Sequence, residues 1–168
     1  MPTLTFGLEI KTLSAEGVFQ GLASTYGNVD LGGDVVERGA FLKTLAGGRQ
    51  RPLLWQHRDP IGTVTLADTD AGLLADGQLA LDVQQAREAM ALVKAGAVRG
   101  LSIGFEAVRS DYQGDVRHLR EVKLWEVSLT PFPMNEAATV RTIKSAQLLE
   151  VRSALHELRR EVLAGLKG

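Results

Sequence analysis

Residues 98–130 read VRGLSIGFEAVRSDYQGDVRHLREVKLWEVSLT, and this stretch decides the fold. Its residue types and its alternation at the start predict two long strands, Val98–Arg109 and Arg117–Thr130. Gln113-Gly114-Asp115 supplies the turn that joins them. Prolines directly after Thr130 end the sheet pattern, because proline cannot donate to a strand ladder. We therefore expect two long strands joined by a turn.

The chain as a whole contains 18 glycines, which are spread out rather than gathered in one linker. This pattern is typical of a β-rich domain with many turns. Further strands are expected at Thr3–Ile10, Val18–Ser24, Pro52–His57, Gly62–Ala67 and Leu73–Val83. Apolar residues at helical spacing predict a helix over Gln84–Ala95, and a short helix is expected over Arg38–Leu45.

The C-terminal part changes in character from Ile143 onward. Its apolar residues are spaced three and four apart over about two heptads: Leu148, Val151, Leu155, Leu158 and Val162. This pattern predicts a domain over residues 1–142 and a C-terminal amphipathic helix over residues 143–168. The apolar seam either packs on the domain or contacts a second copy or a scaffold, because so short a seam does not distinguish these cases.

Composition excludes several classes of protein. The chain has 168 residues, 45% hydrophobic and 23% charged, which is ordinary for a globular protein of one domain. Its net charge of −1 argues against nucleic acid as a partner, because phosphate neutralisation needs a basic excess. The absence of cysteine excludes disulfides and a cysteine nucleophile. No apolar run is long enough for a membrane span and no signal pattern is visible, so we expect a soluble, cytosolic protein.

Residues 100–104, Gly-Leu-Ser-Ile-Gly, match the G-x-S-x-G pattern of a nucleophile elbow. That elbow needs a helix directly after the serine, whereas the residues after Ser102 predict a strand, so we reject it. In a strand, Gly100, Ser102 and Gly104 share one face. Two glycines then leave open space at the Ser102 hydroxyl, where a substrate backbone is expected to approach. Ser102 is thus a candidate nucleophile, and a structural serine in a tight sheet crossing is the alternative.

A nucleophilic serine needs a base, and the chain has three histidines. His57 ends an apolar run that should hold its ring at the edge of the core. His118 follows a turn and is expected to be exposed, and His156 falls in the C-terminal helix. The three lack the spacing of a metal site, so we expect no metal and no cofactor.

Glu126 is the candidate for the group that orients the base, because it is the single acid in the mostly apolar stretch Leu124–Leu129. Burying it is costly, so it either faces water or meets a positive partner. Asp30 and Asp34 are rivals, although aspartates among glycines usually form turns. Ser128 is a rival nucleophile without an argument for open space around it.

Six short segments become informative when they are taken together in their order. They are Gly21–Tyr26, Asp30–Asp34 leading into Arg38–Phe41, Pro52–His57, Leu101–Phe105, and Glu126–Pro131 with Asn135 and Ala137 after it. This ordered set resembles the prohead (procapsid maturation) protease family of tailed phages, distant relatives of the herpesvirus assemblin proteases. The resemblance covers roughly residues 5 to 140.

The resemblance implies a serine endopeptidase with Ser102 as nucleophile, His57 as general base and Glu126 as third member. A carboxylate in the third position departs from the herpesvirus relatives, which have a second histidine there. The implied fold is α+β: a compact, mostly antiparallel β-barrel wrapped by a few helices, like that of the herpesvirus proteases. Dimerisation through residues 143–168 is expected by the same resemblance.

The implied substrates are the phage scaffold protein and the scaffold-like segment of the major capsid protein, and often the protease itself. The implied location is the inside of the immature capsid in the host bacterial cytoplasm. Neither nucleic acid nor a membrane is expected as a partner. The turn over Thr130–Asn135 is a candidate source of N–H donors for the oxyanion.

Three other functions compete with this one. The first is a catalytically inactive capsid-assembly or scaffold protein that retains the protease fold. The second is a small β-barrel module that binds a ligand with the loop at Asp30–Asp34. The third, a metal hydrolase, has little support because the histidines are scattered.

Overall fold

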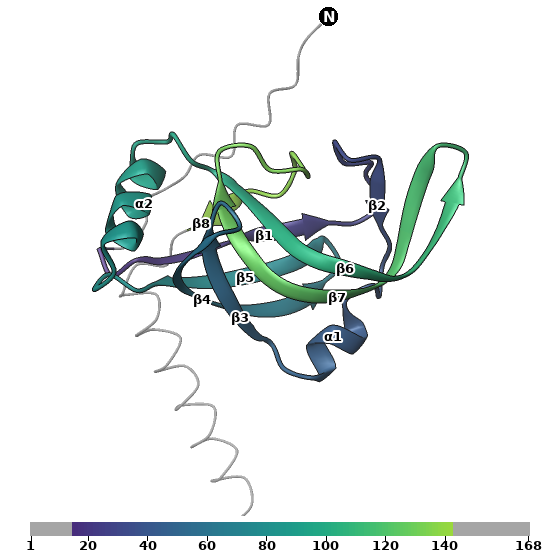
Figure 1. The fold of residues 1–168 in the computed structure, drawn as a ribbon, viewed down its shortest axis with the longest axis horizontal. Coiled ribbons are helices and arrows are strands. Elements are labelled where there is room, and N and C mark those ends of the chain that lie inside the picture. Colours follow the sequence, from purple (N-terminus) through teal and green to yellow (C-terminus); the bar gives the residue numbers. More distant parts are fainter. Residues whose placement is uncertain (1–14, 143–168) are drawn as a thin grey trace, which may run out of the picture.

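The computed structural model describes residues 15–142, and this part of the chain is mostly β-sheet (Figure 1). The strands are β1 (Val18–Thr25), β2 (Asp34–Val36), β3 (Gln50–Trp55), β4 (Asp59–Thr69), β5 (Gly72–Leu79), β6 (Gly100–Gln113), β7 (Val116–Thr130) and β8 (Val140–Thr142). They follow the order β2-β7-β3-β4-β5-β1-β8, and β6 pairs with β7. The strand pairs are antiparallel except those of β7 with β2 and with β3.

The sheet curls, and the start of β6 returns to the side of β1 (Figure 1). Just before β8, Thr139 forms a bridge with Gly100 and its carbonyl accepts the N–H of Leu22 at 3.0 Å. Gly21 allows this approach, since a Cβ there would lie 2.5 Å from the carbonyl oxygen of Thr139. The expected mostly β fold with few helices is therefore confirmed, and its herpesvirus-like barrel form stays a prediction.

Within residues 15–142, two helices lie against this sheet. Helix α1 (Leu42–Ala46) packs on β7 and β4, and α2 (Gln84–Lys94) packs on β3, β4 and β5. The face of α2 predicted from its spacing is the buried one, with Ala86, Ala89 and Val93 inside. Within the described residues no helix is long and apolar enough to cross a membrane.

The core is a cluster of apolar side chains from the strands and both helices. Its largest fully buried members include Phe19, Phe41, Leu53, Ile61 and Leu101. Removing one such side chain from water stabilises the fold by roughly 1.5–3 kcal/mol. This burial anchors the ends of β3, β6 and β7 on which the candidate site residues stand.

The predicted pair of long strands is confirmed as β6 and β7, which pair from Gly100 opposite Thr130 to Gln113 opposite Val116. One end of this ribbon is buried, and the other is exposed and projects beyond the rest of the sheet (Figure 1). The ribbon therefore carries one set of side chains into the core region and a second set into solvent.

Other predictions hold only in part. The short helix predicted from Arg38 begins at Leu42, and the strand predicted over Leu73–Val83 ends at Leu79. Strands β2 and β8 were not predicted, because three residues are too few to show a period. The predicted strand at Thr3–Ile10 and the predicted helix at residues 143–168 lie outside the described residues.

Candidate active site

His57 lies in the turn between β3 and β4, whereas the sequence predicted it at the end of a strand. Its φ is 63° and that of Gln56 is 49°, so two consecutive side-chain-bearing residues adopt the left-handed conformation. This conformation costs roughly 1–2 kcal/mol per residue and persists where surrounding contacts impose it. Here the N–H of Gln56 donates to the Leu129 carbonyl at 3.1 Å.

Glu126 meets a histidine rather than solvent. Its Oε1 lies 2.5 Å from Nδ1 of His57, although the two residues are 69 positions apart in the chain. The glutamate side chain is 11% exposed and that of the histidine 45%. A carboxylate that accepts the Nδ1 proton fixes the tautomer in which Nε2 carries a lone pair, as a general base requires.

Ser102 stands on β6, next to this pair. The register places Ser102 directly opposite Ser128 and Gly104 opposite Glu126. Residues directly opposite each other share one face, with Cβ atoms roughly 4.5–5.5 Å apart. The strand pairing therefore brings Ser102 to the face on which Glu126 and His57 meet. Among the described residues, no hydrogen-bond partner holds the Ser102 hydroxyl.

Ser128 links the glutamate to the histidine backbone. Its hydroxyl donates to Oε2 of Glu126 at 2.6 Å and accepts the N–H of His57 at 3.0 Å. The residue is fully buried. Sequence reasoning treated Ser128 only as a rival nucleophile and missed this role. The signal was its position two residues after Glu126, which places both on one face of a strand.

Gly100 and Gly104 do not provide the open space that the sequence predicted beside Ser102. A Cβ at Gly100 would lie 2.5 Å from Pro133, and one at Gly104 would lie 2.2 Å from Oε1 of Glu126. The protein itself fills both spaces. The lack of side chains at Gly100 and Gly104 therefore makes room for the loop after β7 and for the Glu126 carboxylate, and not for a substrate backbone.

A cavity of about 140 Å³ lies beside Ser102. Ser102, Ile103 and Phe105 of β6 line it, opposite residues of the loop before β2 and of the loop after β7. Its lining is mostly apolar, with polar groups from Asn28, Asp30 and Asn135. A concave site next to the candidate nucleophile is where a substrate side chain would lie.

The sequence pattern of the caudovirus prohead serine proteases matches residues 6–152. The chain belongs to this family. Ser102, His57 and Glu126 all lie inside the matched range.

Known relatives agree with this membership. The chain is 33% identical over 143 residues to the prohead protease of Enterobacteria phage HK97, covering 80% of this chain and 64% of that protein. It is 28% identical over 148 residues to the prohead protease of Escherichia phage T5, covering 81% of this chain and 68% of that protein. A capsid polyprotein of Pseudomonas phage PAJU2 is 37% identical over 161 residues, which are 88% of this chain and 23% of the polyprotein. The chain thus spans less than two thirds of the HK97 protein's length.

The rival acids have other partners. Oδ1 of Asp30 accepts the N–H groups of Gly32 and Asp34, which is the turn-forming role expected of it. The carboxylate of Asp34 pairs with the guanidinium of Arg117 through two bonds of 2.7 and 2.6 Å. These bonds raise the pKa of Arg117. Neither aspartate contacts His57.

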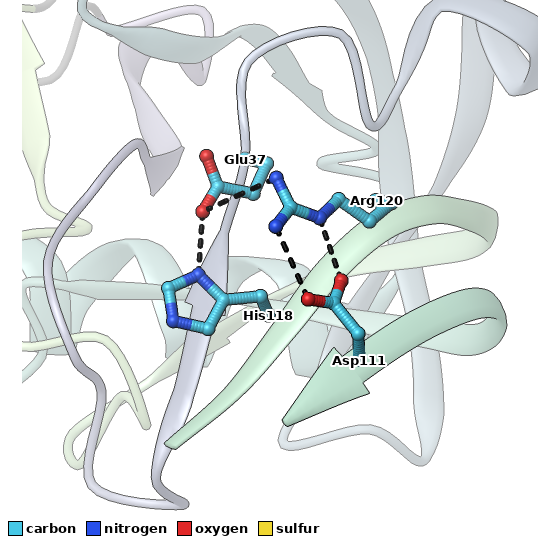
Figure 2. A network of polar contacts seen from close by, with 4 residues as sticks. All are labelled: Glu37, Asp111, His118 and Arg120. Atoms are coloured by element: carbon cyan, nitrogen blue, oxygen red, sulfur yellow. Dashed lines mark hydrogen bonds and ion pairs between the residues drawn. The ribbon is translucent and has the colours of Figure 1, made fainter. Parts of the chain in front are cut away.

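The expectation that His118 is exposed is wrong. Its side chain is only 16% exposed and its Nδ1 lies 2.6 Å from Oε1 of Glu37. Figure 2 shows this pair with Arg120, which approaches Glu37 and also binds Asp111. His118 precedes Glu126 by eight residues of β7, roughly 25 Å along the strand, so it is far from Ser102. His156 lies outside the described residues, among which no cluster of three or more potential metal ligands occurs.

Proposed function

We propose that this chain is a serine endopeptidase that acts in phage prohead maturation, with Ser102 as nucleophile, His57 as general base and Glu126 as the group that orients the base. The 2.5 Å contact between Nδ1 of His57 and Glu126 carries the proposal. Because Nδ1 is engaged, Nε2 is left to accept a proton from Ser102, which stands on the same face of the sheet as Glu126. The contact rests on strand register and on a strained turn, which makes a purely structural pairing a poor explanation.

The reaction follows from these positions. Nε2 of His57 takes the Ser102 proton as Oγ attacks the scissile carbonyl, and the same proton then passes to the leaving amine. Water next attacks the acyl-serine and loses a proton to His57. His57 then returns this proton to Oγ of Ser102 as the bond to the acyl group breaks and the carboxylic acid product leaves. Glu126 holds Nδ1 throughout and stabilises the imidazolium that forms at each step.

The loop after β7 supports the proposed source of oxyanion donors. Pro131 and Pro133 have no N–H, and the N–H of Phe132 donates to the Thr130 hydroxyl. Met134 and Asn135 remain, and both line the cavity beside Ser102. Their N–H groups are the donors we propose for the tetrahedral intermediate.

The proposed substrates are the scaffold protein and the scaffold-like segment of the major capsid protein, with self-cleavage as a further reaction. Family membership supports this choice, and so does the likeness to a segment of a protein named capsid polyprotein. The proposed place of action is the immature capsid inside the host bacterium. We also propose the herpesvirus-like barrel form of the fold, and a dimer or scaffold contact through residues 143–168.

Labelling with a fluorophosphonate tests the proposal. Wild type, Ser102→Ala and Ser110→Ala are treated at high protein concentration, and their intact masses are measured. One adduct on wild type and on Ser110→Ala, mapped to Ser102 and absent from Ser102→Ala, is the expected result. Ser110 is an exposed control on the far half of β6.

The same three proteins are then incubated with the capsid and scaffold proteins, and cleavage is followed by mass. We expect Ser102→Ala to cleave at least about a thousand-fold more slowly. An absence of both adduct and cleavage with these proteins present would favour the inactive assembly protein and overturn the proposal. Cleavage that a chelator abolishes would favour a metal hydrolase instead.

A further inference from the structure

We propose that Ser128 is a positioning residue of this site, which holds the Glu126 carboxylate and the His57 backbone in one fixed relation. The inference rests on the function proposed above. Ser128 contacts neither substrate nor the reacting atoms in this scheme, so it acts through its two neighbours.

The Glu126 carboxylate is held at both of its oxygens. Oε1 of Glu126 contacts Nδ1 of His57 at 2.5 Å, and Oε2 accepts the Ser128 hydroxyl proton at 2.6 Å. Rotation about the last bond of a glutamate side chain is broad when nothing restricts it. A carboxylate held at both oxygens loses this freedom, so Oε1 stays aimed at the imidazole.

Ser128 also holds the backbone of His57. Strand β3 runs parallel to β7, with Trp55 beside Leu129, and the N–H of Gln56 makes the last bond to a β7 carbonyl. The next N–H, that of His57, donates to the Ser128 hydroxyl at 3.0 Å. A side chain of β7 thus takes over where the ladder ends, at the point where φ becomes positive.

The two hydrogen bonds of the Ser128 hydroxyl run in opposite directions. A serine hydroxyl can donate one hydrogen bond. Here the Ser128 hydroxyl donates to Glu126, and a lone pair of its oxygen accepts the His57 N–H. Both capacities are used, and the residue is fully buried. Ser128 is therefore suited to position the pair and unsuited to be the nucleophile.

Ser128→Ala tests this role in the full chain, with Thr44→Val as the matched control. The Thr44 hydroxyl also accepts a backbone N–H at 3.0 Å, from Leu124 of the same strand, but it contacts neither Glu126 nor His57. Each variant therefore removes one hydroxyl that accepts a backbone N–H. Only the hydroxyl of Ser128 contacts residues of the proposed site.

Two readouts are needed. The ¹⁵N resonances of the imidazole give the tautomer of His57, which we expect to be protonated at Nδ1 in wild type and in Thr44→Val and mixed in Ser128→Ala. The rate of fluorophosphonate labelling against pH gives the function. We expect Ser128→Ala to label about ten-fold more slowly at its optimum, the loss of one hydrogen bond to a charged group. Thr44→Val should label within about two-fold of wild type, a change too small to reflect a lost hydrogen bond in the site.

The outcomes separate the two proposals. A wild-type tautomer and a wild-type labelling rate in Ser128→Ala would overturn the positioning role and leave the protease proposal intact. A tautomer that changes in Ser128→Ala while wild type itself takes no label and cleaves nothing would support the positioning role and overturn the protease. Equal losses in Ser128→Ala and Thr44→Val would show a general structural effect and would count against the positioning role.

Discussion

Two histidine–glutamate pairs lie along β7, and their geometries are nearly the same. Near one end of the strand, Nδ1 of His57 is 2.5 Å from Glu126, and near the other, Nδ1 of His118 is 2.6 Å from Glu37. Distance alone would make each of them the base and the orienting acid of a hydrolase. Their surroundings distinguish them.

The His57 pair is accompanied by hydroxyls, and the His118 pair by a cation. Ser102 and Ser128 stand beside the first, together with a cavity, and the ring of His57 remains 45% exposed. Arg120 approaches Glu37 in the second pair and connects it to Asp111 (Figure 2). A carboxylate that also approaches a guanidinium is typical of an ion-pair network. In our proposal, the carboxylate held by Ser128 beside the unbonded Ser102 hydroxyl instead takes part in proton transfer.

The most severe test of this contrast is the same change made in both glutamates. Glu126→Gln should lower the cleavage rate on the order of 10⁴-fold, the effect of replacing the acid of a serine-protease triad by its amide. The amide presents N–H to Nδ1 and so favours the wrong tautomer of His57. Glu37→Gln should leave the rate within about two-fold, because its histidine lies roughly 25 Å away along β7. Rates on the capsid substrate measure both.

Circular dichroism and thermal unfolding of the two variants provide the control for folding. Should Glu126→Gln retain most of the wild-type rate, or Glu37→Gln lose it, the assignment of the pairs would have to be exchanged or abandoned.

A smaller effect is expected from a methyl group added to β6. A Cβ at Gly104 would lie 2.2 Å from Oε1 of Glu126, so Gly104→Ala must push the carboxylate away from His57. A displacement near 1 Å costs on the order of 100-fold in rate. Gly114→Ala, at the hairpin tip, meets no atom within 4 Å, and its φ of 62° strains only the turn. It should lower stability by about 1 kcal/mol and leave the rate unchanged.

Kinetics and urea unfolding of this glycine pair are read together. A Gly104→Ala protein that is folded and fully active would mean that the contact between Glu126 and His57 is not needed for the reaction.

The sequence predicted the ribbon of β6 and β7 well, because the residue types and the alternation in each long strand indicate β structure. Ser102, Glu126 and Ser128 could be assigned to strands, and alternation put the last two on one face. The register between β6 and β7 was not predictable, since bulges near Gly104 and Arg109 shift it. Register is what sets Ser102 opposite Ser128.

The strained turn at His57 was beyond prediction for a related reason. Positive φ is uncommon for residues with a Cβ, and at Gln56 and His57 it accompanies hydrogen bonds to β7, such as that of His57 to Ser128, 71 residues later in the chain. The error at His118 has the same origin, because Glu37 reaches it across the parallel pairing of β2 with β7. Strand pairing between distant segments, rather than local sequence pattern, determines which histidine lies beside which glutamate. The sequence-based assignment of His57 and Glu126 to one site therefore depended on the resemblance to a family.

The mildest expected effect concerns the exposed end of the ribbon and depends on pH. Hydrogen bonds from Arg120 lower the pKa of Asp111, so the folded state favours the ionised carboxylate. A lowered pKa adds stability above the unfolded value of about 3.9, and this stability is lost as the pH falls through the folded pKa. Asp111→Asn should therefore unfold at slightly lower urea concentration than wild type at pH 7, and the gap should close in acid. Salt should also narrow the gap, because an exposed pair is screened.

Cleavage should not change at any pH where both proteins are folded. A gap that persists at pH 2 would mean that Asp111 does not stabilise the fold through its charge. A loss of activity in this variant would mean that the two ends of β7 are coupled and that the pair of His118 and Glu37 contributes to the reaction after all.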